Sequence, residues 1–295
     1  MTQAELIVDA RNSVGESPVW NVSERALYWV DIPAKKLQRW DAQTGAVRVW
    51  QAPEMLACIA PHSSGGFIAG METGLFHIHC TAGDTLDYTL LQTTPHAAAG
   101  MRWNDGRCDR QGRFLAGSMV MDMGKCQNAG VIISYEKNSV FKTLRKSIVT
   151  PNGMAFSPDG RTLYTSDSHP SAQTIWASDY DTESGTPSNQ RVFVDMKPLP
   201  GRPDGAAVDA DGCYWICAND AGLVHRFTPA GVLDMSLTVP VKKPAMCAFG
   251  GADLRTLYVT SIRPDGIDLS DQPLAGGVFA LRPGVQGLPE PVFVA

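Results

Sequence analysis

Thr150-Pro151-Asn152-Gly153-Met154-Ala155-Phe156-Ser157-Pro158-Asp159-Gly160-Arg161-Thr162-Leu163-Tyr164 is the stretch that decides the fold. It reads as a short strand, a tight Pro-Asp-Gly turn and the start of a second strand. A near copy runs from Arg202 to Trp215 and carries Pro203-Asp204-Gly205 in place of Pro151-Asn152-Gly153. Because both copies share the turn and its flanking strands, we expect a chain built from repeated β units.

The second strand of this unit recurs along the whole chain of 295 residues. Neighbouring copies are about 40 to 50 residues apart, which suits a four-stranded propeller blade. A third strand, a polar or glycine turn and usually a more polar fourth strand follow each copy. The pattern predicts an all-β fold, a six-bladed β-propeller with four antiparallel strands per blade, as a single domain over residues 1–295. The copies are centred on Tyr28, Ile68, Leu115, Tyr164, Trp215 and Tyr258.

Two strand-like segments at the ends of the chain have no local partner. They are Glu5 to Val8 and Pro291 to Val294. We expect both to pair as outer strands of the last blade, because this would close the ring and cover a free edge. The alternative is that both ends fray.

Composition and charge restrict the partners. The net charge is −5 and no basic cluster is present, which argues against nucleic acid and anionic membranes. No apolar leader begins the chain and no apolar run approaches the roughly 20 residues of a membrane span. The seven cysteines are scattered without metal-type spacing, so we expect reduced, mostly buried thiols in a cytoplasmic protein. We also expect a monomer or weak oligomer. Those in strand-like runs are Cys58, Cys108, Cys217 and Cys247.

The residue before the first glycine of each unit is the candidate for function. In a propeller the first strand of each blade lines the channel, and its start faces one mouth. Two carboxylates and two amides at equivalent positions would suit a hard divalent cation, and without one the carboxylates would repel. The alternative, ordinary hairpin turns, does not explain why the hits are in phase. The positions are Glu16, Asn104, Asn152 and Asp204, with small residues near Ala57 and Ala245.

At these residues the chain resembles the senescence marker protein/gluconolactonase/luciferin-regenerating enzyme family, from about residue 12 to the end. The resemblance implies a six-bladed propeller with one divalent cation, which Glu16, Asn152 and Asp204 would hold. Calcium, zinc, magnesium, manganese and iron(II) all remain open as that cation. The matching segments are Gly15–Trp20, Val30–Lys36, Arg102–Asp109, Pro151–Ser157, Pro203–Gly205 and Cys247–Gly251.

The same resemblance implies that Arg102 and Asn104 contact the substrate, and leaves open whether Asn104 also binds the cation. It implies substrate contacts by Met119 and Asp122 as well. Animal members of the family carry Glu where this chain has Asp122, so the side chain reaches less far here. His169, in a loop expected at the mouth, is a further candidate for substrate contact.

Members of this family hydrolyse lactones of sugar acids. The resemblance therefore implies a metal-dependent hydrolase that opens an aldonolactone. A bound water, or one that Asp204 activates as general base, would attack the carbonyl, and Arg102 would bind a sugar hydroxyl or the ring oxygen. For Arg102 the alternative is a structural salt bridge with Asp105 or Asp109. For the protein, the alternatives are a non-catalytic calcium-binding propeller and a metal-dependent esterase or phosphotriesterase.

Overall fold

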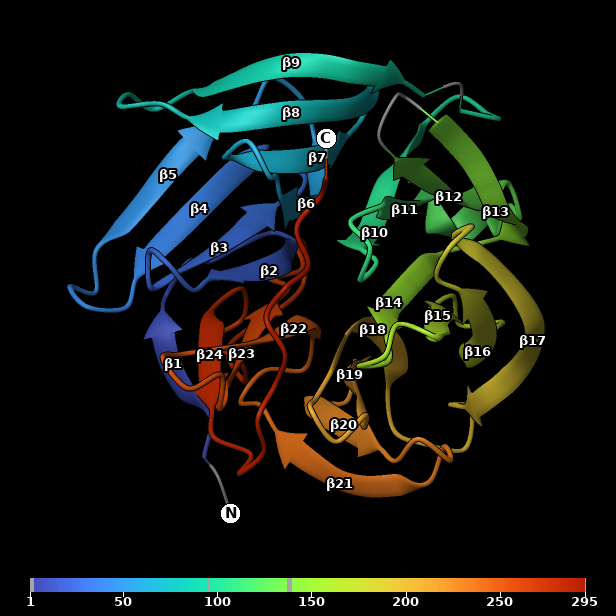
Figure 1. The fold of residues 1–295 in the computed structure, drawn as a ribbon. Coiled ribbons are helices and arrows are strands. Elements are labelled where there is room, and N and C mark those ends of the chain that lie inside the picture. Colours follow the sequence, from blue (N-terminus) through green and yellow to red (C-terminus); the bar gives the residue numbers. More distant parts are fainter. Residues whose placement is uncertain (1–2, 95, 137–139, 295) are drawn as a thin grey trace.

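The computed structural model describes residues 3–94, 96–136 and 140–294. They form six four-stranded antiparallel sheets arranged as a ring, which Figure 1 views along its axis. The predicted six-bladed β-propeller is therefore confirmed. All seven cysteines are free thiols, and the four expected in buried strands are buried. No helix in the described ranges is long and apolar enough to cross a membrane.

Each blade runs from an inner strand at the channel to an outer strand at the rim. The inner strands are β2 (Gly15–Asn21), β6 (Leu56–Pro61), β10 (Met101–Cys108), β14 (Pro151–Phe156), β18 (Arg202–Val208) and β22 (Pro244–Gly250). The second strands are β3 (Ala26–Asp31), β7 (Phe67–Met71), β11 (Phe114–Val120), β15 (Thr162–Asp167), β19 (Tyr214–Asn219) and β23 (Thr256–Ser261). The third strands are β4 (Lys36–Asp41), β8 (Gly74–Cys80), β12 (Gly130–Glu136), β16 (Thr174–Asp181), β20 (Leu223–Phe227) and β24 (Val278–Leu281). The outer strands are β5 (Val47–Gln51), β9 (Leu86–Thr93), β13 (Val140–Ile148), β17 (Thr186–Asp195), β21 (Leu233–Thr238) and, from the amino end, β1 (Glu5–Val8).

Burial decreases from the channel to the rim. Every residue of β22 is buried, whereas β17 is mostly exposed. The inner strands pack between two neighbouring blades, so even their polar residues are buried, whereas the outer strands are largely exposed to water. This gradient explains why the sequence repeat is clearest in the first two strands of each blade.

Only the amino end closes the ring as predicted. Strand β1 pairs antiparallel with β24, with Leu6 opposite Phe279. The prediction that Pro291–Val294 joins this blade is wrong: the amide of Phe293 donates to the carbonyl of Pro61 at 2.7 Å, beside blade 2. The edge of β24 is already occupied by β1, and the prolines of this tail have no N–H for a strand ladder.

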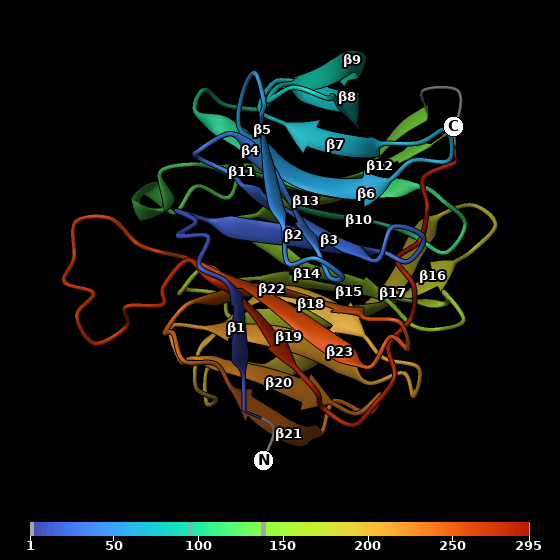
Figure 2. The same cartoon turned by 90° about the vertical axis from the view of Figure 1, so that its left-hand side faces the viewer.

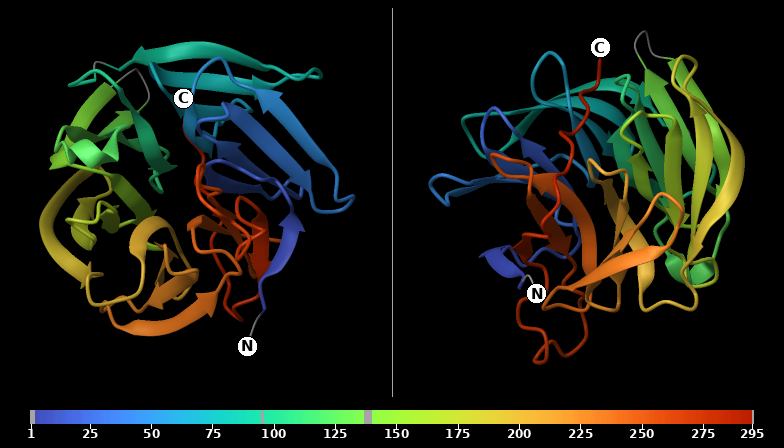
Figure 3. Two further views of the ribbon diagram at one scale, coloured as in Figure 1. Left: turned by 180° about the vertical axis from the view of Figure 1, so that it is seen from behind. Right: turned by 60° about the horizontal axis from the view of Figure 1, so that its bottom comes forward.

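The two faces of the ring differ as a result. We call the end at which the inner strands begin the upper mouth, and the end at which they finish the lower mouth. The C-terminal segment lies across the lower mouth, while the β23–β24 connection and the short 3-10 helix η1 (Met123–Lys125) project at the upper one (Figure 2). Figure 3 (left) shows the ring from behind, and the C-terminal segment does not lie across that face.

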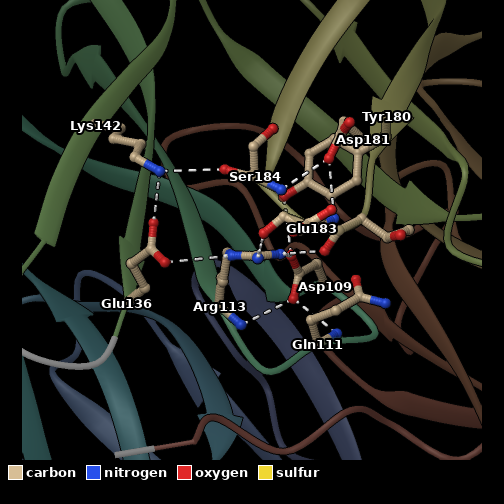
Figure 4. A network of polar contacts seen from close by, with 10 residues as sticks. Asp109, Gln111, Arg113, Glu136, Lys142, Tyr180, Asp181, Glu183 and Ser184 are labelled. Carbon is tan, nitrogen blue, oxygen red and sulfur yellow. Dashed lines mark hydrogen bonds and ion pairs between the residues drawn. The ribbon is translucent and has the colours of Figure 1, made fainter.

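Buried charges at the lower end connect neighbouring blades. The Asp109 carboxylate, which follows β10, accepts hydrogen bonds from Arg113 Nη1 and the Tyr180 hydroxyl, both at 2.9 Å (Figure 4). Arg113 also contacts Glu136 at 3.4 Å and donates to the carbonyl of Thr182 at 3.1 Å. Because these groups come from blades 3 and 4, the network fixes one blade against the next.

Candidate metal and substrate site

All six inner strands are irregular at the same level, just inside the upper mouth. At this level each inner strand loses its register with its neighbour, as in a β-bulge. Five of these irregularities place two residues opposite one, and the one in β6 inserts a single residue. A bulge re-aims side chains and is frequent beside active sites. The shifts lie between Glu16 and Val19, Leu56 and Cys58, Trp103 and Gly106, Asn152 and Ala155, Pro203 and Ala206, and Pro244 and Cys247.

The predicted ligands occupy two adjacent positions of the bulge, not one equivalent position. Glu16 and Asn152 are the last paired residues before it, whereas Asp204 is the first residue inside it. Asn104 shares the position of Asp204. In blades 1 and 4 the next residue has a left-handed backbone, with φ of 48° at Ser17 and 63° at Gly153. Counting residues back from the turn therefore predicted the level of these four side chains in the channel. It did not predict that Asn104 and Asp204 lie inside the bulge, one position further than Glu16 and Asn152.

The carboxylates at this level are buried, and neither forms an ion pair with a described residue. Glu16 and Asp204 are each 8% exposed. Burial raises the pKa of Glu16 well above its usual value, and repulsion from Asp204 and Asp105 raises it further. Burial also raises the pKa of Asp204 to about 7, although Arg202 opposes this shift. The expected repulsion between the two carboxylates is thus present.

Oxygen atoms around these carboxylates are only partly engaged. Asn219 Nδ2 donates to Asp204 Oδ2 at 2.7 Å, and Asn152 Nδ2 donates to Ser168 Oγ at 3.0 Å. Asn152 Oδ1 is buried with no hydrogen-bond partner among the described residues. No three His, Cys, Asp or Glu side chains of the described residues are grouped so that they could hold a metal. The candidate set instead combines two carboxylates with one amide oxygen, and this hard oxygen chemistry fits a divalent cation.

Arg102 is positioned by its own strand. Its Nη1 donates to the carbonyl of Trp103 at 2.7 Å and to Asn104 Oδ1 at 2.8 Å. Asn104 Nδ2 in turn donates to the carbonyl of Pro151 at 2.9 Å, so both ends of this amide are engaged. Met119 lies opposite Arg102 in the β10–β11 pair and is 2% exposed.

The salt bridge considered for Arg102 is not found among the described residues. Asp109 pairs with Arg113 at the lower end, and Asp105 Oδ2 accepts the amide of Met154 at 2.8 Å. Burial lowers the pKa of Arg102, but an arginine keeps its charge at neutral pH. Its cation is therefore available to a ligand at this level of the channel.

Two of the predicted substrate residues lie apart from the buried group. The Asp122 side chain is 58% exposed and its carboxylate is 3.5 Å from Lys125 Nζ. His169 Nδ1 contacts Ser171 Oγ at 2.7 Å, and its Nε2 contacts the carbonyl of Met123 at 3.3 Å. These residues belong to the loops that rim the upper mouth, and no contact found for them reaches Glu16 or the buried amides.

Sequence reasoning missed the residue that holds Asp204. Asp31 and Asp167 are the last residues of their second strands. Each accepts two backbone amides from the segment that leads into the inner strand of its own blade. Asn219 has the equivalent register in blade 5 but donates to Asp204 instead. The sequence signal for this role was that Asn219 stands where two other copies of the repeat have the aspartates Asp31 and Asp167. Asp105, with a buried and unpartnered Oδ1, was named only as a possible partner of Arg102.

Comparison with known proteins places these residues in a family context. The family described as "SMP-30/Gluconolactonase/LRE-like region" matches residues 14–263. The chain is 38% identical to 6-deoxy-6-sulfogluconolactonase of Pseudomonas putida and 31% identical to regucalcin of Danio rerio, in both cases over 97% of each chain. The crystal structure of regucalcin from Agrobacterium tumefaciens, titled a calcium-binding protein, superposes with a TM-score of 0.91 at 28% identity, covering 99% of this chain and 97% of that one.

Proposed function

The chain belongs to the SMP-30/gluconolactonase/LRE-like family, and on this premise we propose that it is a metal-dependent lactonase that opens the ring of an aldonolactone to the aldonic acid. The 38% identical relative is named for a lactone of this kind. The calcium, zinc, magnesium, manganese and iron(II) ions remain the candidate cations. A cytoplasmic location and a monomeric or weakly oligomeric state stay predictions.

One observation carries the proposal. Glu16, Asn152 and Asp204 bring buried oxygen atoms to one level of the channel, and neither carboxylate forms an ion pair with a described residue, so the pKa values of both are raised. Uncompensated buried charge is costly, so it is retained where a bound ligand or a reaction requires it. A divalent cation held by these three residues would polarise the lactone carbonyl and stabilise the oxyanion.

Asp204 is the residue proposed to move the proton. Asn219 holds Oδ2, and Oδ1 has no hydrogen bond to the described protein. Burial raises the pKa of Asp204 to about 7 in the metal-free protein, and its free oxygen places it to accept a proton. In the proposed step Oδ1 takes a proton from water as the water oxygen bonds to the carbonyl carbon. The ring C–O bond then breaks, and the ring oxygen receives that proton and becomes the hydroxyl of the product.

Arg102 is proposed to orient the sugar. Its Nη1 donates to Trp103 and Asn104, so the guanidinium is already ordered before substrate binds. Binding would therefore cost little additional side-chain conformational entropy. Charge-assisted hydrogen bonds from this group to a ring hydroxyl would hold the carbonyl near Asp204. Met119 would form the wall beside it, and Asp122 would contact substrate only from the rim.

Lactone opening followed by proton release tests this proposal. We expect turnover of glucono-1,5-lactone that EDTA abolishes and one of the candidate cations restores. Asp204→Ala should lower kcat by about 100-fold or more. Asp211→Ala, a matched change at a carboxylate that is 70% exposed at the lower end, should not.

Three results would redirect the assignment. Calcium binding without turnover would support the non-catalytic propeller. Faster cleavage of aryl esters or phosphotriesters than of lactones would support the esterase. Full activity of both the EDTA-treated protein and the Asp204→Ala variant would show that the mechanism is wrong.

A further inference from the structure

Arg202 lies above the candidate cation ligands. It is the first residue of β18, two residues before Asp204, and its side chain is 20% exposed. Its Nη1 donates to the carbonyl of Ser168 at 3.1 Å, and its Nη2 donates to Asn219 Oδ1 at 3.4 Å. Ser168 and Asn219 are the two residues that hold the candidate ligands Asn152 and Asp204. The guanidinium is therefore at the entrance of the candidate site, between blades 4 and 5.

A second cation shares the carboxylate that pairs with Arg202. Arg202 Nε donates to Asp220 Oδ2 at 2.6 Å, and Lys243 Nζ binds Asp220 Oδ1. The side chain of Lys243 is 26% exposed and that of Asp220 is 43% exposed. Two positive charges thus meet one negative charge in a cluster that solvent reaches. The cluster formed by Arg202, Lys243 and Asp220 has one positive charge in surplus.

The surplus charge has no partner deeper in the proposed site. A divalent cation would balance Glu16 and Asp204, and Arg102 would offset the buried Asp105 that acts on both carboxylates, so the cluster would keep its own surplus charge. The mouth would then attract anions, and a neutral polyol would gain nothing from this field. An anionic group on the substrate would gain charge-assisted hydrogen bonds from Arg202 and Lys243.

We propose that the Arg202–Lys243–Asp220 cluster selects aldonolactones that carry an anionic group at the end of the sugar chain remote from the lactone carbonyl. This inference rests on the proposed lactonase function and names its substrate class. A sulfonate, a phosphate and a carboxylate share the required chemistry. Asp220 acts as the competing anion, because it occupies both cations until the substrate arrives.

The role of Asp220 separates substrate selection from a purely structural brace. If the cluster only fastens the loops at the mouth, Asp220→Asn weakens the brace and cannot improve catalysis. If the cluster binds an anion, the same change frees both cations and raises kcat/KM for anionic lactones. The opposite signs make this variant the decisive one.

The experiment compares kcat/KM for glucono-1,5-lactone with that for its 6-phosphate, 6-sulfonate and 6-carboxylate analogues, after subtraction of uncatalysed opening. We expect the wild type to favour at least one anionic lactone by about tenfold or more, a preference that falls as salt rises. Arg202→Gln and Lys243→Gln should each lower this anionic-to-neutral ratio, and Asp220→Asn should raise it. The ranking of the three analogues identifies the anion.

Arg191→Gln is the matched control. Arg191 forms an exposed pair with Asp179 at 2.8 Å, on the outer part of blade 4, so its replacement should leave the ratio unchanged. Equal or better turnover of the neutral lactone by the wild type would overturn the inference while leaving the lactonase proposal intact. A lower ratio in Asp220→Asn would also overturn it. Absence of turnover with every lactone would refute the proposed function, and this inference with it.

Discussion

The two ends of the propeller channel use buried carboxylates in opposite ways. At the lower end Asp209 is fully buried, and Oδ2 accepts hydrogen bonds from Trp215 Nε1 at 2.9 Å and Arg226 Nε at 2.8 Å. Asp109 has the equivalent network in blade 3 (Figure 4). At the upper end Glu16 and Asp204 repel each other, and burial raises the pKa of both.

The contrast shows how one repeat serves both stability and function. At the lower end the turns provide the amides, and a turn in blade 3 or the third strand in blade 5 provides the arginine, so each carboxylate is satisfied and stabilises its blade. At the upper end Glu16 accepts the amide of Ser17 and Asp204 accepts the side-chain amide of Asn219, but neither carboxylate forms an ion pair with a described residue. A charge that the fold does not satisfy marks the place where a ligand is expected to satisfy it.

Matched substitutions should separate the two ends by their effect on stability. Asp209→Asn removes the buried carboxylate that accepts from Arg226 and Trp215, while Arg226 keeps Asp211 and Asp234, so we expect a loss of about 1–3 kcal/mol in the free energy of unfolding. Asp204→Asn removes an uncompensated charge, so it should leave the metal-free protein as stable as the wild type or more stable. Urea unfolding in EDTA measures both. Equal losses would show that the two ends do not differ.

The pH dependence of cation binding should sharpen the comparison. Since the folded-state pKa of Asp204 is about 7 against an ordinary 3.8, the metal-free folded protein holds a proton that the unfolded chain releases. The destabilisation by this carboxylate is therefore absent below about pH 4, grows towards pH 7 and is complete above it.

A bound cation replaces that proton. We therefore expect the rise in Tm on adding the active cation to be several degrees larger at about pH 8 than at about pH 5.5. Thermal unfolding with and without the cation at each pH measures this difference. In Asp204→Asn the difference should shrink, and an unchanged difference would exclude Asp204 as a ligand.

Near the lower mouth, acid should lower the stability of the protein, whereas at the upper mouth it relieves the destabilisation by Asp204. We expect the effect at the lower mouth to be the smaller one. The His62 ring stacks on His77 with centroids 3.7 Å apart and lies 5.2 Å from the ring of Phe293 in the C-terminal segment. Burial, with the nearby His77 and His79, lowers the pKa of His62 from 6.5 to about 4. The unfolded chain thus binds a proton first, and stability falls as pH falls from about 6.5 to 4.

His62→Gln should make that loss shallower. We expect the Tm of the wild type to fall by a few degrees more than that of the variant between about pH 7 and 4.5, as measured in EDTA. His169→Gln, at the upper mouth, serves as the comparison and should follow the wild type. Parallel curves for His62→Gln and the wild type would show that the histidine stack does not contribute.

The sequence by itself determined the repeat. The Pro-Asp-Gly turn and the alternating strands around Tyr164 and Trp215 are local patterns, so they predicted six blades and the pairing of Glu5–Val8. The same alignment brought Glu16, Asn152 and Asp204 to one level of the channel, and their roles as ligands remain predictions. Each strand and turn is a pattern of neighbouring residues, and the regular repeat of that pattern is what related segments far apart in the chain.

Only the tertiary structure decided what surrounds that level. The bulges displaced Asn104 and Asp204 by one position, because strand register depends on the neighbouring strand and not on residue count. Pairing of β24 with β1 left the C-terminal segment to cross the lower mouth. The contacts of Arg202 with Ser168 and Asp220 join residues 18 to 34 positions apart. The contact with Ser168 requires blades 4 and 5 to meet, and the contact with Asp220 requires β18 and β19 to pair, so no local pattern predicts either one.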